Sequence, residues 1–164
     1  MNAPARQGPV IVGYDGSAAS EGALAETAGL FGSCPVLVVV VWEAGLGFEL
    51  DAPSMNPAPI DIRVAFGVDA QLHERAQLLA DRGAKLAREH GLEAVGLAVA
   101  DDATPGATLV RLARERDARA LVVGSHGHSR LTEIVGHTSA EVIRAAPCPV
   151  VVRGPAVHGV AGGR

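Results

Sequence analysis

Short runs of branched apolar residues alternate along the chain with segments in which apolar residues recur every three or four positions. The runs have the length of β-strands, and their near-continuous apolar character is typical of strands covered on both faces. The intervening segments have the period of amphipathic helices. This alternation predicts an α/β fold, a three-layer doubly wound sandwich around a parallel sheet with right-handed crossovers. The five expected strands are residues 10–14, 35–43, 93–100, 120–124 and 149–153.

Four helices are expected between the strands, and capping residues and prolines mark their ends. Ser17 or Ser20 caps the first helix, and Thr104 with Pro105 marks the start of the third. The fourth helix ends at Pro147, because proline does not continue a helix. The expected apolar stripes are Leu24, Thr27, Ala28 and Phe31 in the first helix, Val68, Leu72, Leu79, Gly83, Leu86 and Ala87 in the second, Leu109, Leu112 and Ala113 in the third, and Val135, Ser139, Val142, Ile143 and Ala146 in the fourth.

Three parts of the chain do not fit the alternation. Residues 44–62 contain several glycines and prolines without a period, which predicts a long loop that is either a functional lid or disordered. A single domain is expected over residues 9–153, preceded by a disordered N-terminus at residues 1–8. The tail, residues 154–164, is rich in glycine and small residues and is expected to be disordered as well.

Composition limits the possible functions. The chain has 164 residues, 48% of them hydrophobic, which suffices for one soluble domain with its own core. The 18 acidic and 14 basic side chains give a net charge of -4, and only three Phe, one Trp and one Tyr are present. This balance argues against nucleic-acid binding. No apolar stretch approaches the ~20 residues that span a bilayer, so we expect a cytoplasmic protein without a membrane segment.

The scarcity of lysine and the spacing of the cysteines narrow the chemistry further. Lys85 is the only lysine, so the chain has no Gly-Lys-Ser/Thr phosphate loop. Schiff-base chemistry would depend on Lys85, which lies in a segment with plain helical spacing. Cys34 and Cys148 lack the CxxC spacing of redox and metal sites. We interpret both cysteines as small core or edge residues.

Two groups of polar and glycine residues follow expected strands. Gly124, Ser125, His126 and Gly127 stand where the fourth strand ends. Because a glycine turn before a helix start lets backbone amides approach an anion, this place suits a phosphate. Asp15 follows the first strand. Its carboxylate can bind an amine or hydroxyl of a ligand, cap the first helix, or do both.

Metal binding and nucleophilic catalysis are both disfavoured. His126, His128 and His137 are close in sequence, but no carboxylate is placed to support them as zinc ligands. We interpret them as polar loop residues. Serines are available, yet the chain has no Gly-x-Ser-x-Gly turn and no carboxylate in the order of a hydrolase. We therefore expect no metal site and no dedicated catalytic residues.

Three sequence blocks stand in a specific order, IVGYDGS at 11–17, VVGSHG at 122–127, and the segment 139–152 with APCPV at 146–150. Together they resemble the universal stress protein family. Their order and spacing cover about 145 residues. The resemblance implies a sheet in the order 3-2-1-4-5 and, in ATP-binding members, ATP at the crevice between strands one and four. In this order strand two is roughly 14 Å from strand five, which excludes a disulfide between Cys34 and Cys148 within one chain.

The phosphate motif of the ATP-binding members, Gly-x2-Gly-x9-Gly-Ser/Thr, is altered in this chain. Gly124 and Gly127 fit, but only eight residues precede Gly136, and His137 follows it. Either Gly136 is the family glycine with His137 in place of the hydroxyl, or Thr138 is the hydroxyl with His137 in place of the glycine. We favour the first alignment, because a one-residue slip turns a helix by about 100°. A loop one residue shorter draws in by up to ~3.5 Å, which weakens or re-aims phosphate binding.

The resemblance implies a role for each residue that matches the family's motifs. Asp15 would meet the adenine or ribose, and the backbone of Val41 would meet the adenine, with the Trp42 ring near the pocket mouth. Helix-end amides and the hydroxyls of Thr138 and Ser139 would donate to the phosphates. The expected nucleotide-binding residues are Tyr14, Asp15, Val41, Gly124, His126, Gly127, His128, Gly136, His137, Thr138 and Ser139.

The sequence therefore predicts a universal stress protein, a stress-response or signalling module that binds ATP, with or without Mg²⁺, or a related adenine nucleotide. One alternative is a member that binds no nucleotide and acts by dimerisation and protein association. A further alternative is a slow ATP hydrolase. Family members commonly pair the last strand across a two-fold axis, so a homodimer through residues 149–153 is expected.

Overall fold

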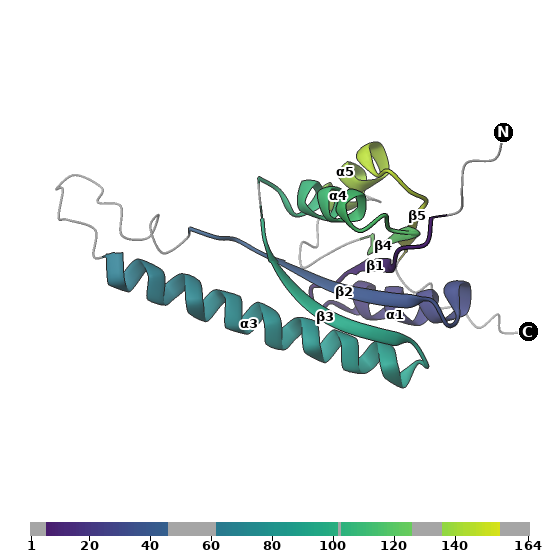
Figure 1. Cartoon of the computed structure of the whole chain (residues 1–164), viewed down its shortest axis with the longest axis horizontal. Helices are drawn as coiled ribbons and strands as arrows, with labels where there is room; N and C mark the ends of the chain where they lie inside the picture. The colour runs from purple at the N-terminus through teal and green to yellow at the C-terminus, as the bar shows by residue number, and fades with distance from the viewer. Residues whose placement is uncertain (1–5, 46–61, 102, 126–135, 155–164) are drawn as a thin grey trace, which may run out of the picture.

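The sheet has five parallel strands, and their order confirms the expected topology. A computed structural model describes residues 6–45, 62–101, 103–125 and 136–154. The strands lie across the sheet in the order β3-β2-β1-β4-β5 (Figure 1). All four neighbouring pairs are parallel. The strand bounds are Val10–Gly13 for β1, Pro35–Trp42 for β2, Glu93–Ala100 for β3, Ala120–Gly124 for β4 and Val150–Arg153 for β5.

The described residues form four helices, which cover the two faces of the sheet. The core clusters place α1 and α3 on one face and α4 and α5 on the other, so the molecule has the three layers that were expected (Figure 1). The long helix α3 runs beside β3 and β2. The helix bounds are Ala18–Phe31 for α1, Ile62–Glu89 for α3, Pro105–Glu115 for α4 and His137–Ala145 for α5.

Strand residues alternate between the two helical layers, because successive side chains of a strand point to opposite faces. Val10 and Val12 pack in the cluster with α1 and α3, whereas Ile11 packs in the cluster with α4 and α5. All three side chains are fully buried. Burial of each contributes about 1.5–3 kcal/mol, which explains why so short a strand can stand at the centre of the sheet.

The helix starts follow the capping residues that the sequence predicts. Of the two candidate serines, Ser17 is the N-cap of α1, and its side chain accepts a hydrogen bond from the Ser20 amide at 3.2 Å. Thr104 caps α4 in the same way, with a 3.1 Å bond from the Ala107 amide, and Pro105 occupies the first turn. These caps fix where both helices begin relative to the strands before them.

Several element boundaries differ by one residue from the prediction. The helix α3 already begins at Ile62, which the sequence had assigned to the long loop 44–62. The strands β1 and β2 end at Gly13 and Trp42, one residue earlier than expected, and β5 begins one residue later. Strand ends depend on whether the neighbouring strand still offers a partner, which a run of apolar residues does not reveal.

The predicted apolar stripe of the fourth helix is wrong at one position. Val142 is fully buried, but Ile143 is 52% exposed. Consecutive helix residues point about 100° apart, and α5 is oriented so that Val142 faces the core while Ile143 faces away from it. Val135, the first residue of that stripe, lies outside the described residues, as do the predicted lid or disordered loop over 46–61 and the predicted disordered ends at 1–5 and 155–164.

None of the helices in the described ranges is both long enough and apolar enough to cross a membrane.

Candidate functional site

The carboxyl ends of the two central strands meet where the winding of the sheet reverses. From β1 the chain proceeds outward to β2 and β3 on one side, whereas β4 and β5 lie on the other. In doubly wound sheets this reversal is where ligands bind. Adjacent strands are about 4.8 Å apart, so the segments that follow β1 and β4 lie at one edge. Both segments carry residues that the sequence predicts for the site.

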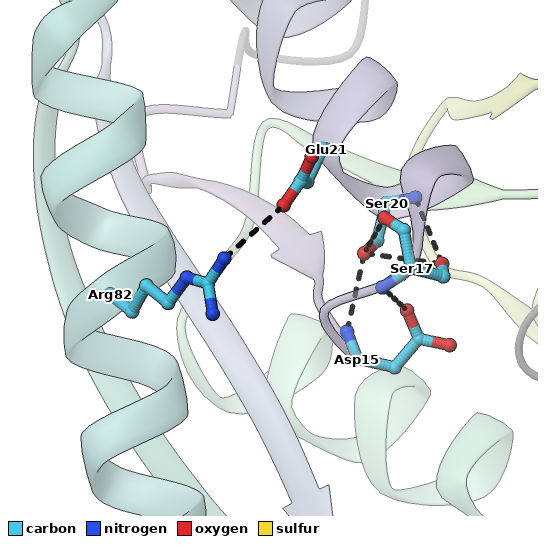
Figure 2. Close-up of polar contacts among 5 residues, drawn as sticks. All are labelled: Asp15, Ser17, Ser20, Glu21 and Arg82. Carbon is cyan, nitrogen blue, oxygen red and sulfur yellow. Dashed lines mark hydrogen bonds and ion pairs between the residues drawn. The ribbon is translucent and has the colours of Figure 1, made fainter.

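The turn after β1 is organised by the carboxylate of Asp15. One carboxylate oxygen, Oδ1, accepts a 3.0 Å hydrogen bond from the Ser17 amide, and the other oxygen points away from Ser17 (Figure 2). The Asp15 amide donates to the hydroxyl of Ser20 at 3.4 Å. Gly16 has a φ of 78°, which favours glycine at this position. The Asp15 carboxylate therefore orders the turn that leads into the Ser17 cap and does not itself cap α1, and it lies at the place predicted for ligand binding.

Tyr14 contributes its backbone to the strand edge and its ring to the core. The Tyr14 amide donates to the carbonyl of Val39 at 2.8 Å. The ring lies against Gly83 of α3, where an added Cβ would approach it to 2.7 Å. The buried hydroxyl has no hydrogen-bond partner in the described part of the chain. Burial raises the pKa of Tyr14, and the nearby Glu21 carboxylate adds to this rise while Arg82 opposes it.

Glu21 and Arg82 form an ion pair that links α1 to α3. The shortest nitrogen to oxygen distance is 4.0 Å, and the two side chains are 41% and 73% exposed (Figure 2). An exposed pair at this distance contributes little to stability, so the ion pair adds little to the packing of α1 against α3.

The glycine at the end of β4 is needed for packing. A Cβ on Gly124 would lie 2.9 Å from the Cβ of Ala19 and 3.1 Å from the Ser20 amide nitrogen. The first turn of α1 therefore approaches β4 closely only because residue 124 has no side chain. The Gly124 carbonyl accepts a 2.7 Å hydrogen bond from the hydroxyl of Ser139, and the Gly136 amide donates to the Ser125 carbonyl at 2.7 Å. These two bonds join the start of α5 to the end of β4.

The start of α5 has amides without partners inside the helix. Gly136 is the N-cap and supplies no side-chain hydrogen bond. The first intrahelical bond runs from the Ala140 amide to the Gly136 carbonyl at 3.0 Å. The amides of His137, Thr138 and Ser139 precede it, so they have no acceptor inside the helix, and amides in this position attract anions.

The predicted site residues around this helix start differ in what they offer. His137 is exposed and Thr138 is half-buried. Ser139 is buried, and its hydroxyl proton already goes to Gly124. His126, Gly127 and His128 lie outside the described residues.

The strand β2 continues past the end of β1, and Val41 lies in this continuation. Its backbone amide and carbonyl point to the side of β2 on which β1 lies. The last residue pair between the two strands is Gly13 with Val39, and the last hydrogen bond joins Tyr14 to Val39. Backbone groups alternate sides along a strand, so the amide and carbonyl of Val41 point the same way as those of Val39. Beyond the end of β1, they form a donor and acceptor pair at the open edge.

The side chains of Trp42 and Val41 lie on opposite faces of the sheet. Its ring packs into the cluster with α1 and α3 and contacts His73 of α3 edge to face, with centroids 5.5 Å apart and an interplanar angle of 70°. The sequence had placed this ring near the pocket mouth. Because neighbouring strand residues face opposite layers, the ring instead lies on the α3 side of the sheet, opposite to the side chain of Val41.

Two carboxylates that the sequence analysis did not single out hold the chain just after β2. The Ala44 amide donates to Oδ1 of Asp101 at 3.3 Å, and the Gly45 amide donates to Oδ2 of Asp69 at 2.9 Å. Asp101 follows the end of β3, so its position after an expected strand was the available signal. Both carboxylates fix the direction in which the chain leaves the site edge.

A cavity of about 490 Å³ lies at the opposite, amino end of the sheet, lined by Arg6, Gln7, Arg119 and Pro149. Both guanidinium groups are already engaged. Arg6 pairs with Asp117 at 3.1 Å, and Arg119 donates to the sulfur of Cys34 at 3.1 Å. The carboxylate of Asp117 offsets the charge of Arg6, whereas a hydrogen bond to a thiol leaves the charge of Arg119 in place.

Cys34 and Cys148 are both free and half-buried. Burial raises the pKa of the Cys148 thiol, while Arg6 opposes the rise. A higher pKa lowers the thiolate fraction at neutral pH, which reduces the reactivity of this sulfur. Within the described ranges, no group of three or more His, Cys, Asp and Glu side chains is arranged to hold a metal ion.

Comparison with known proteins gives a family match and several related structures. A sequence model described as the universal stress protein family matches residues 8–153. The universal stress protein UspA from Lactobacillus plantarum has a TM-score of 0.68 at 19% identity, over 93% of this chain and 99% of that chain. The universal stress protein from Archaeoglobus fulgidus in complex with dAMP has a TM-score of 0.59 at 24% identity, over 90% of this chain and 98% of that chain.

A universal stress protein family protein from Arabidopsis thaliana with AMP bound has a TM-score of 0.58 at 20% identity, over 88% of this chain and 90% of that chain. At these identities the structural matches establish the fold. The curated proteins include no significant match to the sequence.

Proposed function

The chain belongs to the universal stress protein family, and from this premise we propose that it binds an adenine nucleotide at the carboxyl edge of β1, β2 and β4. The observation that carries the proposal is the backbone donor and acceptor of Val41 beyond the end of β1. Adenine presents an acceptor at N1 beside a donor at N6, which complements one N–H and one C=O of a single residue. Two relatives, described with dAMP and with AMP, bind ligands of this class.

The start of α5 supports the placement of the phosphates. Three backbone amides without helical acceptors, at residues 137–139, gather positive dipole charge at the end of β4. Because the hydroxyl proton of Ser139 is committed to Gly124, phosphate contacts would come from these amides, the hydroxyl of Thr138 and the imidazole of His137. Asp15 would contact the ribose or the base through the oxygen that points away from Ser17 (Figure 2).

Within this class we propose ATP, with or without Mg²⁺, as a ligand, in a cytoplasmic signalling module. Lys85 is the only lysine of the chain and belongs to α3, so the terminal phosphates would depend on amides and hydroxyls. Such an arrangement favours modest affinity over fast phosphoryl transfer. We infer that occupancy of the site, rather than turnover, carries the signal. Phosphate release from ATP above the uncatalysed background would contradict that inference.

The base specificity of binding tests the proposal. Isothermal titration with AMP and with IMP is expected to give at least tenfold weaker binding of IMP, which corresponds to about 1.4 kcal/mol. The reason is that hypoxanthine has a donor at N1 and an acceptor at O6, the reverse of adenine, so it leaves both backbone groups of Val41 unpaired. Equal affinities for AMP and IMP would show that this backbone pair does not recognise the base.

The outer edge of β5 supports a second proposal, a homodimer through residues 149–153. Pro149 and Arg153 accept bonds from the β4 side, at 2.9 and 2.8 Å, so the amides of Val150 and Val152 point outward. Val152→Pro removes one outward amide without removing a bond to β4, and it is expected to give a monomer. Val152→Thr keeps the amide and is expected to stay dimeric. Light scattering after gel filtration measures the masses, and a monomeric unmodified protein would refute the dimer.

A further inference from the structure

The two edge strands of the sheet, β3 and β5, differ in whether side chains form hydrogen bonds with their outward backbone groups. The strand β3 is an edge of eight residues, and Val95 on it is 63% exposed. Long edge strands with apolar side chains readily pair with a strand of another molecule, and folded proteins protect them. The hydrogen-bond partners of the outward amides and carbonyls of β3 therefore decide whether this edge is protected.

The outward groups of β3 can be assigned from the alternation of the backbone. The Asp101 amide donates to the carbonyl of Trp42 in β2 at 2.9 Å, so odd-numbered residues of this segment direct their backbone toward β2. Even-numbered residues therefore direct theirs outward. Three outward groups have hydrogen bonds, and in each case the partner is a side chain from α3. They are the carbonyls of Ala94 and Gly96 and the amide of Ala98.

The side-chain amide of Gln77 forms hydrogen bonds with two of these groups, as the backbone of a neighbouring strand would. Its Nε2 donates to the Gly96 carbonyl at 3.2 Å, and its Oε1 accepts from the Ala98 amide at 3.0 Å. The second hydrogen of Nε2 goes to Oδ1 of Asp81, one turn along α3, at 3.0 Å. The side-chain amide is thus held from both sides and presents to β3 the donor and acceptor that a neighbouring strand would present.

A second side chain continues this protection toward the amino end of β3. Arg88, in the last turn of α3, donates from Nη1 to the Ala94 carbonyl at 2.7 Å. The close approach of α3 is possible because Gly96 has no side chain. A Cβ there would lie 2.5 Å from the backbone carbon of Ala80.

The edge of β5 has no such cover in the described part of the chain. In those residues, β5 makes two hydrogen bonds to side chains or loops. The Ser125 amide donates to the Arg153 carbonyl, and the Arg153 guanidinium donates to the Gly154 carbonyl at 3.0 Å. The outward amides and carbonyls of Val150 and Val152 receive no side chain among those residues. As far as residues 6–45, 62–101, 103–125 and 136–154 are concerned, side chains of α3 bond to the outward groups of β3, whereas the outward groups of β5 have no such partner.

We propose that Gln77 and Arg88 block the β3 edge against strand pairing, and that the partner this edge accepts once they are removed is the β3 edge of a second copy of the chain. The block directs association by strand pairing to β5. It also keeps a molecule that pairs through β5 from growing into an open-ended chain through its other edge, since a molecule with two available edges can propagate. This inference does not depend on nucleotide binding.

The test removes the two blocking side chains while keeping their helical stems. The double variant Gln77→Met with Arg88→Met is expected to form species larger than the unmodified protein, increasing with concentration between 10 µM and 1 mM, as measured by sedimentation velocity. Methionine matches both side chains in helix propensity and approximate length but offers no hydrogen bond. Gln71→Met, an exposed position on the same helix, is the matched control and is expected to leave the size distribution unchanged.

Two further measurements connect the effect to the β3 edge. Adding Val95→Lys to the double variant places a charge on that edge and is expected to restore the original size. Hydrogen exchange of the Ala98 amide is expected to accelerate at least tenfold in Gln77→Met alone and to be unchanged in Gln71→Met, with circular dichroism verifying that both variants fold. An unchanged size for the folded double variant up to 1 mM would overturn the proposal. Unchanged exchange of Ala98 would show that Gln77 does not cover the edge in solution.

Discussion

Gly96→Ala is expected to destabilise the protein by about 3 kcal/mol, because the added methyl group would overlap the backbone of α3. The added Cβ would lie 2.5 Å from the carbon and 2.6 Å from the oxygen of the Ala80 backbone, and 2.7 Å from the Asp81 amide. Backbone atoms of a helix cannot rotate away, so α3 as a whole must shift from β3. Urea unfolding followed by circular dichroism measures the change.

A matched control for this substitution exists in the helix α1. Gly29 is exposed in that helix, and a Cβ there would meet nothing within 4 Å. Gly29→Ala is therefore expected to stabilise the protein by about 0.5–1 kcal/mol, because alanine loses less conformational freedom than glycine in a helix. An unfolding midpoint of Gly96→Ala equal to that of the unmodified protein would show that α3 does not approach β3 as closely as described.

His137→Glu is expected to weaken AMP binding at least tenfold while leaving the binding of adenosine unchanged. The residue is exposed in the first turn of α5, beside the amides proposed to hold the phosphate. A carboxylate there repels a phosphate, and two unit charges 4 Å apart near a protein surface interact by about 4 kcal/mol before salt screening. The same carboxylate stabilises a helix start by about 0.3–1 kcal/mol, so the fold is expected to persist.

Binding of AMP and of adenosine, measured at low and at high salt, distinguishes charge repulsion of the phosphate from a general defect of the site. His137→Gln, which has no charge, is the matched control and is expected to retain most of the AMP affinity. The difference between the Glu and Gln variants is expected to shrink at 0.5 M salt, because screening weakens the repulsion. Equal losses of AMP and adenosine affinity in His137→Glu would show that residue 137 affects the site as a whole and not the phosphate.

The positions of the strands and of the helix caps could be predicted because they depend on local signals. Apolar runs mark strands that are buried on both faces, and Ser17 and Thr104 cap helices through side chains close in sequence. The family resemblance then selected one strand order among those that the alternation allows. The switch point and the edge that carries Asp15 and Gly124 follow from that order.

Features that depend on tertiary contacts could not be predicted in the same way. Tyr14 was predicted among the nucleotide-binding residues, and nothing in its sequence neighbourhood indicated that its ring packs against Gly83, a residue nearly 70 positions away. Val142 and Ile143 are adjacent and both apolar, so the sequence does not indicate that Val142 is buried and Ile143 exposed. The contact of Gln77 with β3 likewise depends on how closely α3 lies over Gly96.

The structure also changes which groups can serve the predicted site. Gly124 was expected as a phosphate-binding glycine, and its lack of a side chain is already required by the first turn of α1. Ser139 was expected to donate to phosphate, and its proton goes to the Gly124 carbonyl. A substitution at either position would therefore change packing together with any binding, which makes His137 the sharper probe.

The most direct test of nucleotide binding at this edge is a titration of the ¹⁵N-labelled protein with AMP, followed by amide chemical shifts. The account predicts the largest changes at Val41 and at the amides of His137, Thr138 and Ser139, with no change at Arg119 at the amino end of the sheet. An absence of shifts at millimolar AMP would contradict binding. Shifts confined to residues away from the carboxyl edge of β1, β2 and β4 would contradict the proposed site.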